Sequence, residues 1–204
     1  MNFLFTSPSV EDLIRLLRAW RFWVLGALLG ALLGTALYYV VPPPYRVRAT
    51  VNVDFNLEEA WPKEVDRQQF YYLERESRKL EELAWSDEIM NQLFSEFAIP
   101  VDDLRDKKLH LGQPAEAGWH FYVDDNNARA AEQIASSWAK AFVAKVQSEV
   151  QSGNINEFVK LELTQTQNLP KQRNISLSEY MLAGSMSLLT LAAFIVLFTK
   201  PKNK

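Results

Sequence analysis

The sequence predicts a membrane protein in which two transmembrane helices flank an extracytoplasmic α/β (α+β) domain of order β-α-α-β-β-α-β. Three observations predict this fold. Two long apolar runs lie at residues 22–41 and 180–199, one near each end of the 204-residue sequence. A strictly alternating segment follows the first run, and helical periodicity dominates much of the region after it. That region, residues 42–179, has about 138 residues, which is enough for one domain with its own core.

The first apolar run, residues 22–41, contains no Asp, Glu, Lys, Arg or His. As a helix it would span about 30 Å, the thickness of a bilayer's hydrocarbon core. We expect an uncleaved anchor and not a signal peptide, because the run is long and its end lacks the small-residue cleavage pattern. Residues 1–21 are expected to form a cytoplasmic or interfacial helix, capped by Ser9, that leads into this span.

Three glycines recur every four residues inside the first span, at Gly26, Gly30 and Gly34. This spacing places them on one helix face, where the absence of side chains lets another helix approach closely. We therefore predict that these glycines pack against a helix. The partner is either the second apolar run or a helix of another subunit, and the spacing is compatible with both.

Between the runs, the strongest strand signal follows three prolines at residues 42–44. Apolar and polar residues alternate from Tyr45 to Phe55, as in a strand with one buried face. Because the first and last strands both adjoin an apolar run, we expect them to pair with each other. The other expected elements are helices over 63–84 and 89–97, a hairpin of 108–111 with 118–124, a helix over 126–151 capped by Asp124 or Asp125, and a last strand over 159–164.

Two of these helices have apolar faces that can be named residue by residue. In the shorter one, the core-facing residues are expected to be Ile89, Met90, Leu93, Phe94 and Phe97. In the longer one, they are expected to be Ala131, Ile134, Ala135, Trp138, Ala141, Phe142 and Val146, which follow the i, i+3, i+4, i+7 spacing of an amphipathic helix. Pro170 then marks the way out of the domain toward the second span.

Charge is distributed unevenly along the chain. The whole sequence has a net charge of −3, but residues 42–179 hold 16 Lys and Arg against 23 Asp and Glu, a net charge of about −7. Basic residues lie outside both spans, and residues 200–204 form a basic tail, so both termini are expected in the cytoplasm and the domain on the periplasmic or extracellular side. An acidic domain argues against nucleic acid as a partner.

No motif in the sequence predicts an enzyme, a cofactor or a metal site. The sequence has no Cys and two His, at positions 110 and 120, and it lacks phosphate-loop, dinucleotide and nucleophile-elbow patterns. Most aromatic residues of the domain are expected in the core or an interface. Trp61 and Tyr71, which have polar neighbours, are the candidates for contact with a glycan or a partner.

Three stretches resemble the Wzz-type polysaccharide co-polymerases, the chain-length determinants of bacterial surface polysaccharides. They are the lead-in SVEDLIRLLRAWRFW, the membrane exit PPPYRVRATVNVDF, and the Ala-rich helix DDNNARAAEQIASSWAKAFVAKVQ. With the closing span, the resemblance covers most of the chain as architecture. This chain is similar to a minimal version of that family, because residues 42–179 leave no room for a longer helical extension. It departs from the family pattern in having only Pro170 where members usually have a proline-rich segment before the second span.

The resemblance implies a non-enzymatic, ring-like homo-oligomer in the bacterial inner membrane, in contact with membrane lipid. It would regulate the chain length or export of a surface polysaccharide, beside a polymerase or export machinery and its glycan. Two alternatives stay open: a structural accessory subunit of another membrane complex, and an extracytoplasmic sensor that activates a separate cytoplasmic tyrosine kinase. A membrane-anchored hydrolase is the enzyme alternative, and the sequence offers no catalytic constellation for it.

Overall fold

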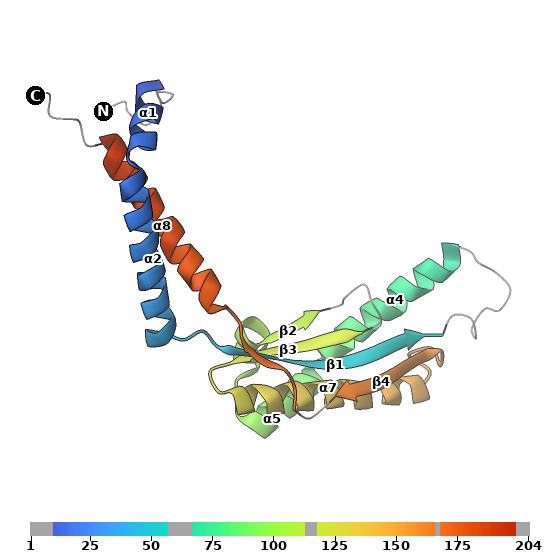
Figure 1. Ribbon diagram of the computed structural model, residues 1–204. Coiled ribbons are helices and arrows are strands. Elements are labelled where there is room, and N and C mark those ends of the chain that lie inside the picture. The colour runs from blue at the N-terminus through green and yellow to red at the C-terminus, as the bar shows by residue number, and fades with distance from the viewer. Residues whose placement is uncertain (1–9, 57–66, 113–117, 166–167, 199–204) are drawn as a thin grey trace, which may run out of the picture. The chain divides into compact units, whose positions relative to one another are not determined.

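The computed structural model describes residues 10–56, 67–112, 118–165 and 168–198, in two compact units. One unit combines the two ends of the chain, Met1–Pro43 and Ile175–Lys204, and the other is the continuous segment Pro44–Asn174. Two apolar helices thus flank a central α/β region built on an antiparallel sheet (Figure 1). We call the second unit the α/β domain and describe each unit by itself.

The terminal unit contains α1 (Val10–Arg18), α2 (Trp20–Val40) and α8 (Leu177–Phe198), of which α2 and α8 lie side by side. We call α2 and α8 the helix pair. Each is long and apolar enough to cross a membrane by length and composition, with mean hydropathies of 1.7 and 2.0. Most of their large apolar side chains are exposed.

Helix α8 begins before the predicted start of the second run. A capping box explains this earlier start: the Ser176 N–H donates to the Glu179 carboxylate (2.6 Å), and the Glu179 N–H donates to the Ser176 hydroxyl (3.3 Å). The S-x-x-E spacing is present in the sequence, but the predicted boundary followed the apolar run, which starts after the charged Glu179.

In the described part of the α/β domain, five strands form one antiparallel sheet. They are β1 (Tyr45–Phe55), β2 (Leu109–Gly112), β3 (Trp119–Asp125), β4 (Val159–Gln165) and β5 (Lys171–Arg173), and the order across the sheet is β2-β3-β1-β4 with β5 also paired to β1. The β2–β3 hairpin is confirmed. The pairing of the first strand with the last is confirmed as well, since β1 pairs with both β4 and β5.

The described residues of this domain form five helical segments. They are α4 (Arg67–Ala84), α5 (Asp87–Phe97), the single turn α6 (Val101–Asp103), the π-helical turn η1 (Leu104–Lys108) that continues it, and the long α7 (Ala128–Gln151). The irregular helical stretch of α6 with η1 lies where one helical turn is expected from the sequence, over residues 102–107, and only the short strand β5 was not predicted.

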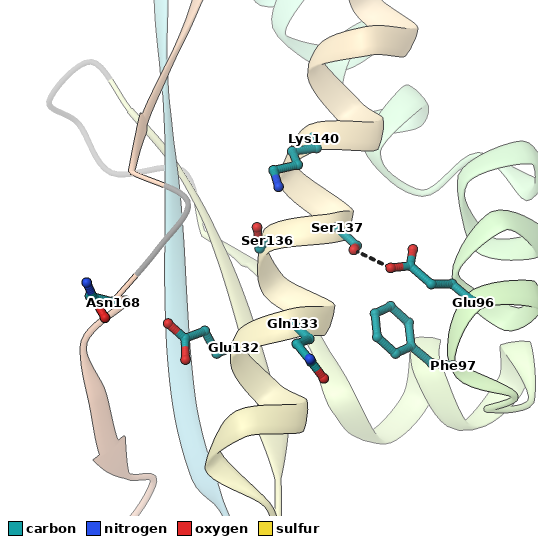
Figure 2. A pocket seen from close by; sticks show the side chains of 8 residues that line it. All are labelled: Glu96, Phe97, Glu132, Gln133, Ser136, Ser137, Lys140 and Asn168. Carbon is teal, nitrogen blue, oxygen red and sulfur yellow. Dashed lines mark hydrogen bonds between the residues drawn. The ribbon is translucent and has the colours of Figure 1, made fainter.

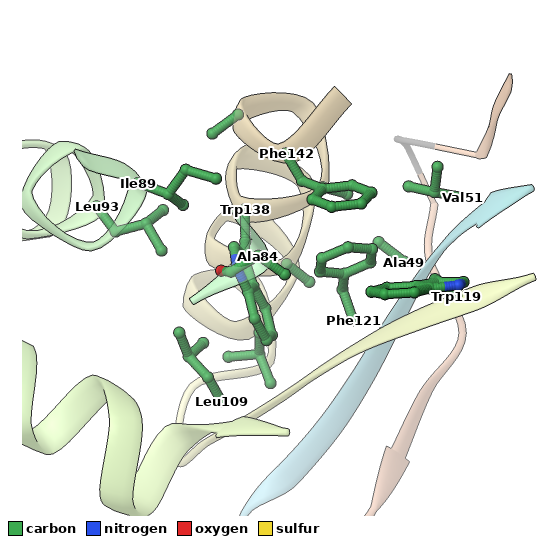
Figure 3. Packing of buried hydrophobic residues seen from close by; sticks show 14 of the residues in the cluster. Ala49, Val51, Ala84, Ile89, Leu93, Leu109, Trp119, Phe121, Trp138 and Phe142 are labelled. Carbon is green, nitrogen blue, oxygen red and sulfur yellow. The ribbon is translucent and has the colours of Figure 1, made fainter. Parts of the chain in front are cut away.

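The core lies between the sheet and α7 and continues between α7 and α5, with Ala84 at the end of α4 beside Trp138 (Figure 3). All seven residues predicted for the apolar face of α7 are buried. Aromatic rings make the central contacts: Phe121 meets Trp138 edge-on at 4.8 Å between centroids, and Trp119 stacks on Phe142 at 5.7 Å. The Trp138 indole N–H is satisfied by the Ala84 carbonyl at 2.9 Å.

Two predictions about this domain were wrong. The N-cap of α7 is Asn127, whose side-chain oxygen accepts from two N–H groups of the first turn; Asp124 and Asp125 are not the cap. They are taken up by ion pairs, with Arg46 and Lys108 respectively. Phe94 was predicted to face the core but is 48% exposed. The apolar face of α5 that packs on the core contains Ile89 and Leu93, and Phe94 lies beyond the edge of this face.

Candidate functional site

The predicted glycine positions lie on the face of α2 that meets α8. A Cβ atom added at Gly30 would lie 2.6 Å from the Ser185 Cα, and one added at Gly34 would lie 2.8 Å from the Tyr180 carbonyl carbon. Such distances are below those that real Cβ atoms adopt, so the two backbones approach this closely only because these positions have no side chain. Gly26 has more room, since a Cβ there would make ordinary contacts of 3.5 Å or more.

The face of α8 that meets α2 also has a glycine at the contact. Gly184 faces Gly30, and a Cβ at Gly184 would lie 3.1 Å from the Gly34 nitrogen. The Ser185 hydroxyl donates a hydrogen bond to the Ala27 carbonyl at 3.0 Å. The structure therefore places the glycine face inside one chain. Sequence reasoning missed Gly184 because a single glycine in the second run has no repeat to mark it.

A charged cluster holds the end of the sheet where the chain enters and leaves the α/β domain. The Asp124 carboxylate is 7% exposed and accepts two hydrogen bonds from Arg46, at 2.7 and 2.6 Å, and one from the Asn174 amide, at 2.9 Å. The hydrogen bond to Asp124 raises the pKa of Arg46 above its ordinary value. The His110 Nε2 lies 3.4 Å from the same carboxylate.

This cluster keeps the two ends of the domain together. The Asn174 N–H donates to the Pro44 carbonyl at 2.9 Å, and Tyr45 is the register partner of Arg173. The Arg173 guanidinium lies 3.8 Å from the centroid of the Tyr45 ring. Pro44 and Asn174 are therefore neighbours in space, although 130 residues separate them in sequence.

The exit proline, Pro170, is an exposed residue between a buried Leu169 and strand β5. Glu132 of α7 fixes this segment: it accepts from the Leu169 N–H at 3.1 Å and pairs with Lys171 at 2.5 Å. The hydrogen bond from Lys171 lowers the pKa of the Glu132 carboxyl. The proline is thus part of a segment tied to α7.

An open groove of about 620 Å³ lies between α5, α7 and the segment before β5 (Figure 2). The Ser137 hydroxyl donates to the Glu96 carboxylate across it at 2.8 Å. The other lining side chains add amides, a hydroxyl, an ammonium, a carboxylate and one aromatic ring: Gln133, Asn168, Ser136, Lys140, Glu132 and Phe97. Sequence reasoning did not single out this groove, because its residues come from separate parts of the chain.

The groove suits a ligand with many hydroxyl groups, because its lining combines hydrogen-bond donors and acceptors with one aromatic ring. In the described part of the chain, no three His, Cys, Asp or Glu side chains converge as metal ligands. Of the two aromatic candidates, Tyr71 is 65% exposed on α4, beside Glu74, Arg75 and Arg78. Trp61 lies outside the described residues. The structure does not bring Tyr71 into the groove of Figure 2.

Comparison with known proteins gives no family for this chain: no family model matches it, and no curated protein matches it.

Proposed function

We propose that the chain is a non-enzymatic, membrane-anchored scaffold that regulates the chain length or export of a bacterial surface polysaccharide. In this proposal α2 and α8 cross the inner membrane, both termini lie in the cytoplasm, and the α/β domain lies in the periplasm or outside the cell. Copies assemble into a ring-like homo-oligomer beside a polysaccharide polymerase or export machinery. The protein needs no cofactor for this role.

One observation supports this proposal most directly. The two ends of the α/β domain are hydrogen bonded to each other, and each continues into a helix long and apolar enough to span a bilayer. A domain closed in this way is compatible with two antiparallel spans that carry it on one side of a membrane. The resemblance of the three sequence stretches to Wzz-type co-polymerases is the reason that we propose a polysaccharide as the polymer on which this scaffold acts.

The polar groove of the domain adds to this proposal. Its hydroxyl, amide and carboxylate groups are the kinds of group that exchange hydrogen bonds with sugar hydroxyls, and Phe97 offers a ring for sugar C–H groups. A scaffold that contacts its polymer needs such a hydrogen-bonding surface, and it needs neither a catalytic nucleophile nor a general acid. Tyr71 is a second exposed aromatic residue that a glycan or a partner can contact.

Deletion of the gene in its own bacterium tests the proposal. We expect the surface polysaccharide to change in length distribution or amount on a gel, and re-expression of the wild-type chain to restore it. An unchanged polysaccharide would overturn the proposal. Co-purification distinguishes the alternatives: partners without a glycan role would indicate an accessory subunit, and a bound tyrosine kinase would indicate a sensor.

Orientation is tested separately. The chain has no cysteine, so a Ser152→Cys variant, in the exposed turn after α7, gives one thiol in the α/β domain. We expect a membrane-impermeant maleimide to label it in spheroplasts. Labelling only after the cells are lysed would place the domain in the cytoplasm.

A further inference from the structure

The sheet of the α/β domain has one side that faces the core and one that does not. Strand alternation places Val47, Ala49 and Val51 toward α7, where they are fully buried. The residues between them, Arg48 and Thr50, belong to the opposite face. Figure 3 shows Ala49 and Val51 on the side of the sheet that faces α7. On the opposite face the side chains are exposed or half-buried, except for that of Asp124, which is 7% exposed.

Strand register gathers both histidines of the protein on this opposite face. Tyr122 on β3 is the register partner of Arg48 on β1 and of His110 on β2, and His120 is the partner of Thr50. The Thr50 hydroxyl lies 3.1 Å from His120 Nδ1, and the His120 and Tyr122 rings meet edge-on at 5.8 Å. We call Arg48, His110, His120 and Tyr122 the basic face.

The basic face carries one exposed cation, Arg48, within an acidic domain. The carboxylate beside it, Asp124, is already neutralised by its two hydrogen bonds from Arg46. Arg48 is exposed and makes no ion pair with any residue that the structure describes. Burial and the nearby positive charge of Arg48 lower the pKa of His120, so its ring is neutral at pH 7 and offers a hydrogen bond.

An aromatic ring lies at the centre of these polar groups. The Tyr122 ring lies over Gly112, where an added Cβ would be 2.9 Å from the ring's Cε2. The Arg46 guanidinium is 5.9 Å from the centroid of the same ring. The half-buried Tyr122 ring, beside the His120 imidazole, provides a platform for a sugar. The cation for a carboxylate is the exposed guanidinium of Arg48, because that of Arg46 is paired with Asp124.

We propose that the basic face binds the carboxylate-bearing sugars of an acidic polysaccharide. The Arg48 guanidinium pairs with a sugar carboxylate, the ring nitrogen of His110 and the Thr50 hydroxyl exchange hydrogen bonds with sugar hydroxyls, and the Tyr122 ring receives sugar C–H groups. The proposal rests on the proposed function, because that function makes a polysaccharide the polymer near this domain. Charge complementarity selects an acidic polysaccharide over a neutral one.

Binding of the full-length chain, in a zwitterionic detergent, to immobilised polygalacturonate tests this inference, with dextran as the neutral comparison. We expect binding to polygalacturonate and none to dextran. An Arg48→Glu variant should bind at least about 10-fold more weakly, because one attractive pair becomes a repulsive one. Arg129→Glu, at an exposed position on α7, makes the same change of charge away from the basic face and should bind within about twofold of wild type.

A second variant, Tyr122→Ser, separates the ring from charge: it should weaken binding and leave the salt dependence unchanged. The thermal transition of each variant, followed by tryptophan fluorescence, shows that it is folded. Equal losses in Arg48→Glu and Arg129→Glu would overturn the inference in favour of general charge attraction. Loss of oligomer mass in Arg48→Glu would instead make this face an interface between copies.

Two further outcomes would also overturn it. Wild-type chain that ignores polygalacturonate but binds phosphatidylglycerol nanodiscs through Arg48 would assign the face to lipid headgroups. A polysaccharide phenotype on gene deletion, together with no binding to polygalacturonate, would leave the proposed function standing and remove this site. The reverse result, binding without a deletion phenotype, would retain the site and remove the proposed function.

Discussion

Replacing Gly30 with alanine adds one methyl group where the structure has no space for it. The added Cβ would lie 2.6 Å from the Ser185 Cα and 2.7 Å from the Gly184 carbonyl carbon. Both contacts are with backbone, so no side-chain rotation relieves them. Ordinary Cβ contacts begin near 3.4 Å, so we expect α2 and α8 to separate by most of an ångström at this point.

The cost of that separation follows from what it breaks. The neighbouring close contact at Gly34 and the Ser185–Ala27 hydrogen bond lie within a turn of Gly30, and both depend on the same backbone distance. Overpacking of a tight contact typically costs about 1–3 kcal/mol, and one hydrogen bond between membrane helices is worth about 0.6 kcal/mol. We therefore expect Gly30→Ala to weaken the helix pair by about 2–3 kcal/mol.

Gly26→Ala is the matched control on the same helix face. Its Cβ would lie 3.5 Å or more from Leu188 and Ala192, which is ordinary van der Waals contact. Because alanine is also the better helix former, by roughly 0.5–1 kcal/mol, this variant should be neutral or slightly more stable.

Disulfide trapping measures the pairing directly, since the wild-type chain has no cysteine. We expect Ala27→Cys combined with Ser185→Cys to form a disulfide within one chain under mild oxidation. Gly30→Ala should slow this reaction, and Gly26→Ala should not. A disulfide that appears only as a cross-linked dimer would refute the intrachain pairing, and equal rates in the two alanine variants would refute the steric argument.

Two other perturbations test the α/β domain, with unfolding of the full chain in detergent followed by tryptophan fluorescence. Asp124→Asn should lower the free energy of unfolding by about 2 kcal/mol, which is less than for a fully buried ion pair because Arg46 is 33% exposed. Asp102→Asn, at an exposed position, should leave the free energy of unfolding almost unchanged. Equal effects of the two substitutions would contradict the role of the charged cluster. The pKa of His120 is lower in the folded state than its ordinary value of 6.5, so the unfolded state binds more protons as the pH falls. The stability that the neutral His120 ring contributes is therefore fully present above pH 6.5 and is lost as the pH falls through the folded-state pKa. The stability of His120→Asn should therefore depend less on pH between 7.5 and 5.5, and an unchanged slope would contradict this linkage.

Sequence periodicity predicted the local elements of the domain well, because one buried face leaves a regular trace. In β1 every second side chain points to the core, and in α7 the apolar side chains recur every three or four residues on the face toward the core. The pairing of the first and last strands was also predictable, since both adjoin an apolar run. The first two inferences need only the local residue pattern, and the third needs only the positions of the two apolar runs.

The candidate sites were predictable only in part, because they depend on register between distant segments. Thr50 and His120 are 70 residues apart, and nothing in either segment indicates that their side chains meet. Glu76 is fully buried in a helix whose pattern reads as polar, where Lys79 at 3.0 Å and Arg75 at 3.1 Å satisfy its charge. A local cap was predicted for Asp124 because capping is a short-range rule, and the ion pair that replaces it is long-range.

The intrachain use of the glycine face limits how copies of this protein can associate. Gly30 and Gly34 are buried against α8 of the same chain, so they are not available to a neighbouring subunit while that contact persists. The exposed surface of α2 consists instead of large side chains, among them Leu25, Leu28, Leu29, Leu32 and Leu33. Such a surface suits lipid, and it lacks the small residues that favour close helix contacts between chains. A ring of copies would therefore be held mainly by the α/β domain, and its mass in detergent should survive Gly30→Ala even where the helix pair loosens.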